Sequence, residues 1–166
     1  NAERKTVDGN GVLRIVSAMT IGNIEIRQAK EQDSQPLFEW RNHKTIRAVS
    51  RNNAPLVWED HQRWLREVID AKNRELLIGI SANQPVGVVG FEKDGDVTEV
   101  SIYLVPEGGF VGQGRNLLLS AEKWLKANRP DIKSIRARVL SKNDVSKNLF
   151  LRSNYRALMI CYQKEL

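Results

Sequence analysis

Three polar side chains fall on one face of the segment from residue 97 to 105, where they could act on a bound molecule. The segment alternates with a period of two, which places Glu99, Ser101 and Tyr103 on one side and apolar residues on the other. A carboxylate at such a position can accept a proton from a bound molecule, which is one role open to Glu99. A surface or ion-paired glutamate is an equal alternative.

Four glycines follow this strand within residues 108–114, directly before a segment with helical periodicity. Glycine leaves backbone N–H groups unobstructed and a helix start carries partial positive charge, so the segment predicts a site for a pyrophosphate. Arg115 adds charge at the helix start, although a flexible turn would also explain the glycines. A Rossmann fingerprint is disfavoured because hairpins precede the loop, and a Walker loop is excluded because no Gly-Lys-Ser/Thr occurs.

A second group of chemistry-bearing residues lies in the first half of the chain, at Trp40-Arg41-Asn42, Arg47 and His61. Arginine pairs with phosphates and tryptophan offers a stacking face, so these residues predict a pocket for a phosphorylated molecule. The alternative is a helix that ends in a solvated arginine and a core tryptophan. His61 belongs to an apolar helical stripe, which favours packing or substrate contact over a role as a base.

The segments that must position these residues alternate between strand and helix patterns. Asp33 is placed to cap a first helix, and Asp94-Gly95-Asp96 is a typical hairpin turn. The second helix has an apolar stripe of Trp58, His61, Trp64, Leu65, Val68 and Ile69. The order β-α-α-β-β-β-α-β-α-β predicts an α/β (α+β) domain with a mixed central sheet. The expected strands are 24–27, 75–82, 85–92, 97–105, 134–140 and 155–162, and the expected helices are 33–40, 58–69, 117–128 and a short one from 143.

Length and composition bound the class of protein. The 166 residues suit one domain, expected at 22–166, with 1–21 a linker or the tail of a preceding domain. The net charge of +6 is concentrated in residues 112–166, where 12 Lys/Arg exceed 4 Asp/Glu, so that region is either a solvated face or suits a polyanionic ligand. Aromatic residues are not interleaved with the basic ones, which disfavours nucleic acid.

Several classes are disfavoured by what the sequence lacks. No apolar run approaches the roughly 18 residues of a membrane helix, and no signal peptide is evident, which predicts a soluble, cytoplasmic protein without a membrane partner. The sequence contains one cysteine, Cys161, and two histidines. These are too few ligands for a typical Cys/His zinc site, so no metal is expected. Cys161 is best interpreted as a small buried residue of the last strand.

Two motifs together resemble the GNAT acyltransferases. Residues 99–115, Glu-Val-Ser-Ile-Tyr-Leu-Val-Pro followed by the glycine loop and Arg115, resemble the acetyl-CoA motif of that family, and residues 143–155 resemble its second motif. The resemblance covers about residues 24–162 and implies the GNAT fold, with acetyl-CoA as co-substrate. The catalytic candidates are Glu99 and Tyr103, from their shared face of the strand. The cofactor-binding residues that it implies are Leu104, Val105, Gly109, Val111, Gly112, Gln113, Gly114, Arg115, Asn143, Ser146 and Phe150.

The sequence departs from the family pattern at two positions. Gly109 stands where the motif usually has Gln or Arg, so backbone amides must carry more of the phosphate binding. Phe150 stands where many members have the tyrosine that protonates the leaving thiolate, and phenylalanine has no proton to give. Tyr103, Tyr155 or a water molecule are the alternatives for that role.

The first half of the chain resembles the amino-sugar acetyltransferases of pseudaminic acid biosynthesis. That resemblance implies transfer of acetyl to the 4-amino group of a UDP-linked amino sugar, and residues 7–16 also resemble the end of the UDP-sugar hydrolase of that pathway, as in a fused enzyme. Ribosomal N-terminal acetyltransferases share a related Trp-Arg pattern, so a protein acceptor is the alternative, and a non-enzymatic binding domain is a third. The oligomeric state stays open. The substrate-binding residues implied are Trp40, Arg41, Asn42, Arg47 and His61.

Overall fold

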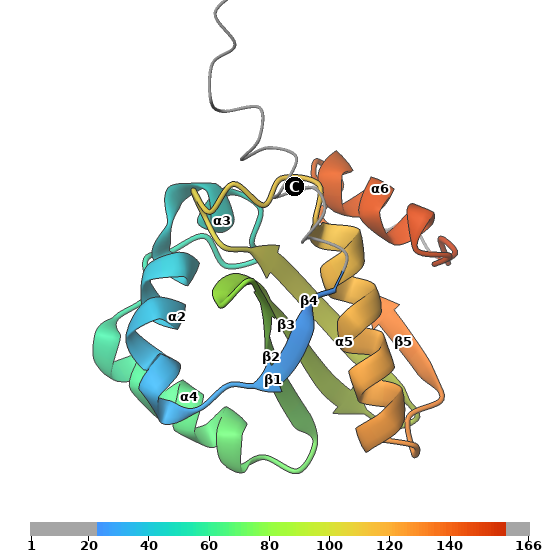
Figure 1. Cartoon of the computed structure of the whole chain (residues 1–166), viewed down its shortest axis with the longest axis horizontal. Helices are drawn as coiled ribbons and strands as arrows, with labels where there is room; N and C mark the ends of the chain where they lie inside the picture. Colours follow the sequence, from blue (N-terminus) through green and yellow to red (C-terminus); the bar gives the residue numbers. More distant parts are fainter. Residues whose placement is uncertain (1–22, 159–166) are drawn as a thin grey trace, which may run out of the picture.

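The computed structural model describes residues 23–158 and has a five-stranded mixed sheet at its centre (Figure 1). Strands β1 to β4 are antiparallel neighbours, and β5 lies parallel to β4 at the edge. The predicted mixed sheet of an α+β domain is therefore confirmed. The strands are β1 (Glu25–Gln28), β2 (Arg74–Ser81), β3 (Gln84–Asp94), β4 (Val97–Leu104) and β5 (Ser134–Ala137).

Helices cover both faces of this sheet, with α2 and α4 on one side and α5 on the other (Figure 1). They are the short 3-10 helix η1 (Glu31–Asp33), α2 (Ser34–Asn42), α3 (Lys44–Ala48), α4 (Trp58–Asp70), α5 (Gly114–Asn128) and α6 (Asp144–Arg152). The helices expected at 33–40, 58–69, 117–128 and from 143 are thus present, whereas η1 and α3 were not expected. None of the helices within residues 23–158 is long and apolar enough to cross a membrane.

Each face of the sheet has its own apolar cluster. The α5 face buries Leu117 and Leu118 with the strand residues Leu77 and Val89, and the α4 face buries a smaller group around Leu65. Close approach of α5 requires glycine on the sheet. A Cβ on Gly87 would lie 2.4 Å from the Tyr103 carbonyl oxygen and 2.6 Å from Leu117. The sheet separates the two clusters. Val100, Ile102 and Leu104 of β4 pack on the α5 side, so the opposite, polar face of β4 is directed at α2 and α4.

Four details differ from the sequence prediction. Asp33 does not cap α2 through its side chain; its carboxylate instead accepts hydrogen bonds from Arg27 and from the Lys30 N–H and so holds η1. The stripe of α4 is narrower than expected, because Trp64 and Ile69 are 41% and 39% exposed.

The other two differences lie late in the chain. Strand β5 ends at Ala137 and not at 140, since its pairing with β4 stops there. The strand expected at 155–162 is absent from residues 155–158, and its remainder, with Cys161 and the N-terminal segment 1–21, lies outside the described residues.

Candidate active site

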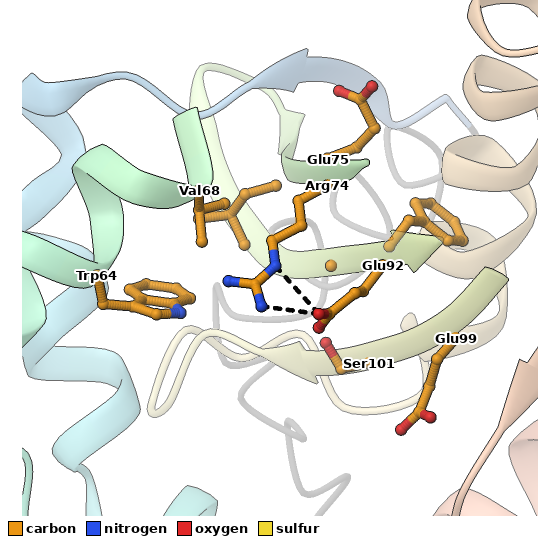
Figure 2. Close-up of a pocket in the computed structure, with 10 residues that line it drawn as sticks. Trp64, Val68, Arg74, Glu75, Glu92, Glu99 and Ser101 are labelled. Carbon is orange, nitrogen blue, oxygen red and sulfur yellow. Dashed lines mark hydrogen bonds and ion pairs between the residues drawn. The ribbon is translucent and has the colours of Figure 1, made fainter. Parts of the chain in front are cut away.

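Two adjoining hollows lie between α4 and the sheet, with volumes of about 140 Å³ and 90 Å³. Neither is large enough alone for a typical small-molecule ligand. They share Trp64, Leu76, Gly90 and Ser101, so together they form one groove, which we call the acceptor groove. Figure 2 shows the larger hollow, where Trp64 projects from α4 beside the Arg74 guanidinium.

Glu99 lies at one end of the acceptor groove and is ion-paired with two arginines. Its Oε1 is 3.0 Å from Arg51 Nη2, and its Oε2 is 3.1 Å from Arg138 Nη1. The carboxylate points away from the Arg74–Glu92 pair (Figure 2). Glu99 is thus ion-paired in the structure, with one arginine on each carboxylate oxygen.

Tyr103 and Ser101 continue the polar face of β4 into the smaller hollow, which Arg41 and His61 also line. Burial raises the pKa of the Tyr103 phenol well above its ordinary value, and the nearby Arg41 offsets only part of that shift. Tyr103 therefore keeps its proton at neutral pH. It can donate a proton or a hydrogen bond but cannot act as a base.

His61 is buried, with only 3% of its surface exposed, and its ring is fixed by a single hydrogen bond. Its Nε2 lies 2.9 Å from the Ser34 carbonyl oxygen, and because a carbonyl can only accept, Nε2 carries the proton. Burial lowers the pKa of His61, with the Ser34 contact opposing, so the ring is neutral at pH 7. Its Nδ1 has no partner among the described residues. The expectation of packing or substrate contact, more than catalysis, fits this position.

The predicted acceptor-binding residues around α2 divide into two groups. Arg41 lines the groove and also donates to Ser50 Oγ at 2.6 Å. Asn42 and Arg47 do not line either hollow. Trp40 packs on the apolar cluster of the α4 face, as the core alternative had it.

Asn42 and Arg47 instead hold the loop between α3 and α4, residues 49–57. The Asn42 amide accepts from the Leu56 N–H at 2.7 Å and donates to the Leu56 carbonyl at 3.2 Å. The Arg47 guanidinium donates to the carbonyls of Asn42 and Asn53. The loop is fixed by these bonds, and it is the loop that carries Arg51 to Glu99.

The edge of β4 is left open beyond its pairing with β5, which covers only Val97–Val100. The Val105 N–H is donated to the Val86 carbonyl on β3, so by the alternation of an antiparallel pair Ile102 and Leu104 turn their N–H groups to the opposite edge. We call the point where β5 leaves β4 the fork. The N–H of Leu104 is thus directed to the open edge of β4, beyond the fork, whereas the N–H of Val105 is already donated to β3.

The glycine loop connects the fork to α5. Gly109 and Gly112 have φ angles of +70° and +89°, which L side chains rarely adopt, and no atom lies within 4 Å of where their Cβ would be. The Gln113 side chain does not cap α5 and accepts from Asn116 instead, so within residues 23–158 the first N–H groups of the helix have no side-chain acceptor. Val111 is 94% exposed on this loop. The segment therefore leaves space that is compatible with an anion, and the pyrophosphate site stays a prediction.

The remaining predicted cofactor residues surround α6. The Arg115 guanidinium donates to the Arg152 carbonyl at the end of that helix, and Asn143 caps its start by accepting from the Ser146 N–H. Phe150 is buried in the α5 face of the core. All of these side chains have structural contacts of their own.

Tyr155, one alternative for the missing acid, lies against Phe150 with ring centroids 5.0 Å apart. Its hydroxyl donates to Glu122 at 2.6 Å, and burial together with that carboxyl raises the Tyr155 pKa well above its ordinary value. Tyr155 does not line the acceptor groove, whereas Tyr103 does. Position therefore favours Tyr103.

The residues that were not found from the sequence include Trp64, which lines the groove, and Arg51 and Arg138, which lie outside both hollows but pair with Glu99. Arg51 lies 48 positions from Glu99 in a loop without a motif, so no local pattern pairs them. Arg138 lies in the segment predicted as a strand, on the same face as Arg136. The sequence pattern gives no reason to assign a function to one of these arginines and not to the other. Trp64 was assigned to the buried stripe of its helix, yet it lines both hollows.

A family model of the acetyltransferase (GNAT) domain matches residues 23–156. The chain therefore belongs to the GNAT family and is an N-acetyltransferase. None of the curated protein sequences matches it significantly. Within residues 23–158, no group of three or more His, Cys, Asp or Glu side chains is arranged to hold a metal ion.

Solved structures with the same fold include three that cover most of this chain. A domain from Methanocaldococcus jannaschii is 28% identical, with 81% of this chain and 88% of that chain covered and a TM-score of 0.67. The aminoglycoside acetyltransferase AAC(6')-Ib, in complex with coenzyme A and kanamycin, is 17% identical over 81% and 84% of the chains, at a TM-score of 0.70. Spermidine N-acetyltransferase from Vibrio cholerae, in complex with CoA and spermine, is 15% identical, with 78% of this chain and 79% of that chain covered and a TM-score of 0.69.

Proposed function

We propose that this acetyltransferase uses acetyl-CoA to acetylate the 4-amino group of a UDP-linked amino sugar. The carrying observation is the charge of the acceptor groove. Its three carboxylates are all paired with arginines: Glu75 with Arg129 at 2.9 Å, Glu92 with Arg74 at 2.7 Å, and Glu99 with Arg51 and Arg138. A groove whose carboxylates are all paired offers little to a polycationic acceptor and more to one that carries phosphate.

The donor is proposed to lie along the open edge of β4, with its pyrophosphate over the glycine loop. Leu104 offers backbone groups on the open edge of β4 beyond the fork, and Gly112 and Gly114 offer N–H groups at the start of α5, whereas the Gln113 N–H is donated to the Phe110 carbonyl. Acetyl-CoA supplies the activated acyl group when bound. The residues present fit it, because the loop has open space where side chains would otherwise block the phosphates.

The acceptor is proposed to enter from the α4 side, opposite α5. Arg41 would contact the diphosphate, and the exposed face of Trp64 would support the sugar or uracil ring. The buried His61 Nδ1 would accept a hydrogen bond from the acceptor. Glu99, directly or through a water molecule, would take the proton from the amine, and Tyr103 would give its proton to the departing thiolate.

The experiment is a comparison of acceptors by release of free CoA. A UDP-4-amino sugar should show a higher kcat/KM than spermidine, kanamycin or ribosomal N-terminal peptides. Arg41→Ala should raise the KM for the UDP-sugar about tenfold and leave the KM for acetyl-CoA nearly unchanged. Arg66→Ala, an exposed arginine of α4 outside both hollows, is the matched control. Faster acetylation of a peptide than of any UDP-amino sugar would replace this proposal by the protein acceptor.

A further inference from the structure

We propose that Arg51 and Arg138 form an anion-binding subsite for the phosphate groups of the acceptor, and that occupation of this subsite releases Glu99 for proton transfer. The proposal rests on the function proposed above, since it names which residues recognise the anionic part of the acceptor. Neither arginine belongs to the motifs of the sequence.

The geometry of the three residues is that of a clamp with one carboxylate between two guanidinium groups. Each oxygen of Glu99 has its own arginine, at 3.0 Å and 3.1 Å. The arginine side chains are 68% and 53% exposed, whereas Glu99 is only 28% exposed. The arginines can therefore turn toward a ligand in the groove while Glu99 stays in place on β4.

The position of the clamp ties it to the reaction. Arg138 directly follows Ala137, the last residue of β5 that pairs with β4, so this arginine lies at the fork. Arg51 reaches the same point from the 49–57 loop, which Asn42 and Arg47 hold through backbone hydrogen bonds. Two cationic groups thus meet beside the open edge of β4 from elements far apart in the sequence.

The charge of the clamp defines the class of ligand. Two guanidinium groups and one carboxylate leave one net positive charge. A phosphate or diphosphate offers several oxygens to both arginine forks at once, and such pairs are stronger than a single shared carboxylate. A UDP-linked amine, with two phosphate charges and one ammonium, carries one net negative charge and so complements the clamp. Polyamines and aminoglycosides carry no anion and would leave Glu99 occupied.

The exchange of partners couples recognition to chemistry. When phosphate oxygens take the arginine N–H donors, the Glu99 carboxylate loses both partners and becomes free to accept a proton from the ammonium, directly or through a water molecule. The neutral amine then forms its bond to the acyl carbon, and the C–S bond breaks with its electron pair on sulfur. Tyr103 gives its proton to that thiolate, and the second proton of the nitrogen restores the Tyr103 hydroxyl. An acceptor without an anionic group does not bring about this release.

The test measures binding of UDP, as the probe of the subsite, by calorimetry on the full chain. Arg51→Ala and Arg138→Ala should each weaken UDP binding about tenfold or more, while Arg66→Ala leaves it unchanged. Uridine, which has no phosphate, should bind the arginine variants and the unaltered protein alike. Glu99→Gln should tighten UDP binding several-fold, because it removes the competing carboxylate, and should lower kcat for the UDP-amino sugar.

The outcomes separate this inference from the function on which it rests. Unchanged UDP affinity in both arginine variants, with folding verified by circular dichroism, would overturn the subsite, as would weaker UDP binding by Glu99→Gln. Arg51→Lys, which keeps charge without the planar fork, should lie between the unaltered protein and Arg51→Ala. UDP binding that depends on both arginines, in a protein that acetylates no UDP-amino sugar, would support the subsite and refute the proposed function.

Discussion

Gly112→Asp and Gly112→Asn form a matched pair that tests where the donor pyrophosphate binds. Gly112 has a φ of +89° and no atom within 4 Å of a built Cβ, so both side chains fit but both share the strain of a left-handed backbone, about 1–2 kcal/mol. Asp and Asn have the same shape, and they differ by one negative charge. The difference between the two variants therefore isolates the electrostatic effect.

The magnitude of that effect follows from Coulomb's law. A carboxylate about 6 Å from one phosphate charge, at an effective dielectric constant of about 20, is repelled by about 3 kcal/mol, and salt reduces this value. We therefore expect acetyl-CoA to bind Gly112→Asp about 10-fold to 100-fold more weakly than Gly112→Asn.

Isothermal calorimetry at low and at moderate salt measures both affinities, and urea unfolding tests whether the two variants lose similar stability. The difference in affinity should shrink as salt is added. Equal acetyl-CoA affinities for Asp and Asn, in two variants that remain folded, would place the pyrophosphate away from the loop.

Four further predictions concern the acceptor side and the fold. Tyr103→Phe should lower kcat about 10²-fold or more with little change in either KM, as measured by CoA release. Because burial raises the pKa of Tyr103, kcat of the unaltered protein should show no loss from tyrosine ionisation up to pH 9. Gly87→Ala should cost about 1–3 kcal/mol in urea unfolding, since the added methyl meets a backbone oxygen that cannot move freely. Burial lowers the pKa of His61 in the folded protein below its unfolded value of about 6.5. The stability that His61 contributes is therefore present above pH 6.5 and is lost as the pH falls toward the folded pKa. Urea unfolding of His61→Gln should thus show a smaller loss of stability between pH 7 and pH 5 than that of the unaltered protein. Asn42→Ala should weaken UDP binding in calorimetry, and the effects of Asn42→Ala and Arg51→Ala should be less than additive, because Asn42 acts by holding the loop that carries Arg51.

Most of the fold could be predicted from the sequence because its signals are local. The alternation along β4 placed Glu99 and Tyr103 on one face, and the spacing of Leu117 and Leu118 identified the buried side of α5. The end of β5 could not be predicted in this way. Residues 134–140 alternate to the last position, and the strand stops at Ala137 because the pairing with β4 ends there, which is a property of the tertiary structure.

The candidate site was predicted only in part, since its polar contacts join distant segments. The Trp-Arg-Asn motif was interpreted as a set of acceptor contacts, yet only Arg41 lines the groove. Asn42 bonds Leu56, 14 residues away, and a side-chain amide that fixes a loop has the same sequence pattern as one that binds a ligand. Residue type alone could not distinguish these two roles.

If the proposed subsite is correct, the contacts of the 49–57 loop give Asn42 and Arg47 an indirect part in acceptor recognition. Without the Asn42 and Arg47 bonds, Arg51 would sit on a loop free to move, and holding its guanidinium 3.0 Å from Glu99 would cost conformational entropy. Because those bonds are made within the protein, the ordering is complete before the acceptor arrives. In the proposed subsite only the exposed side chains of Arg51 and Arg138 would then have to turn from Glu99 to the phosphate, which would favour acceptors that carry phosphate over those that carry only amines.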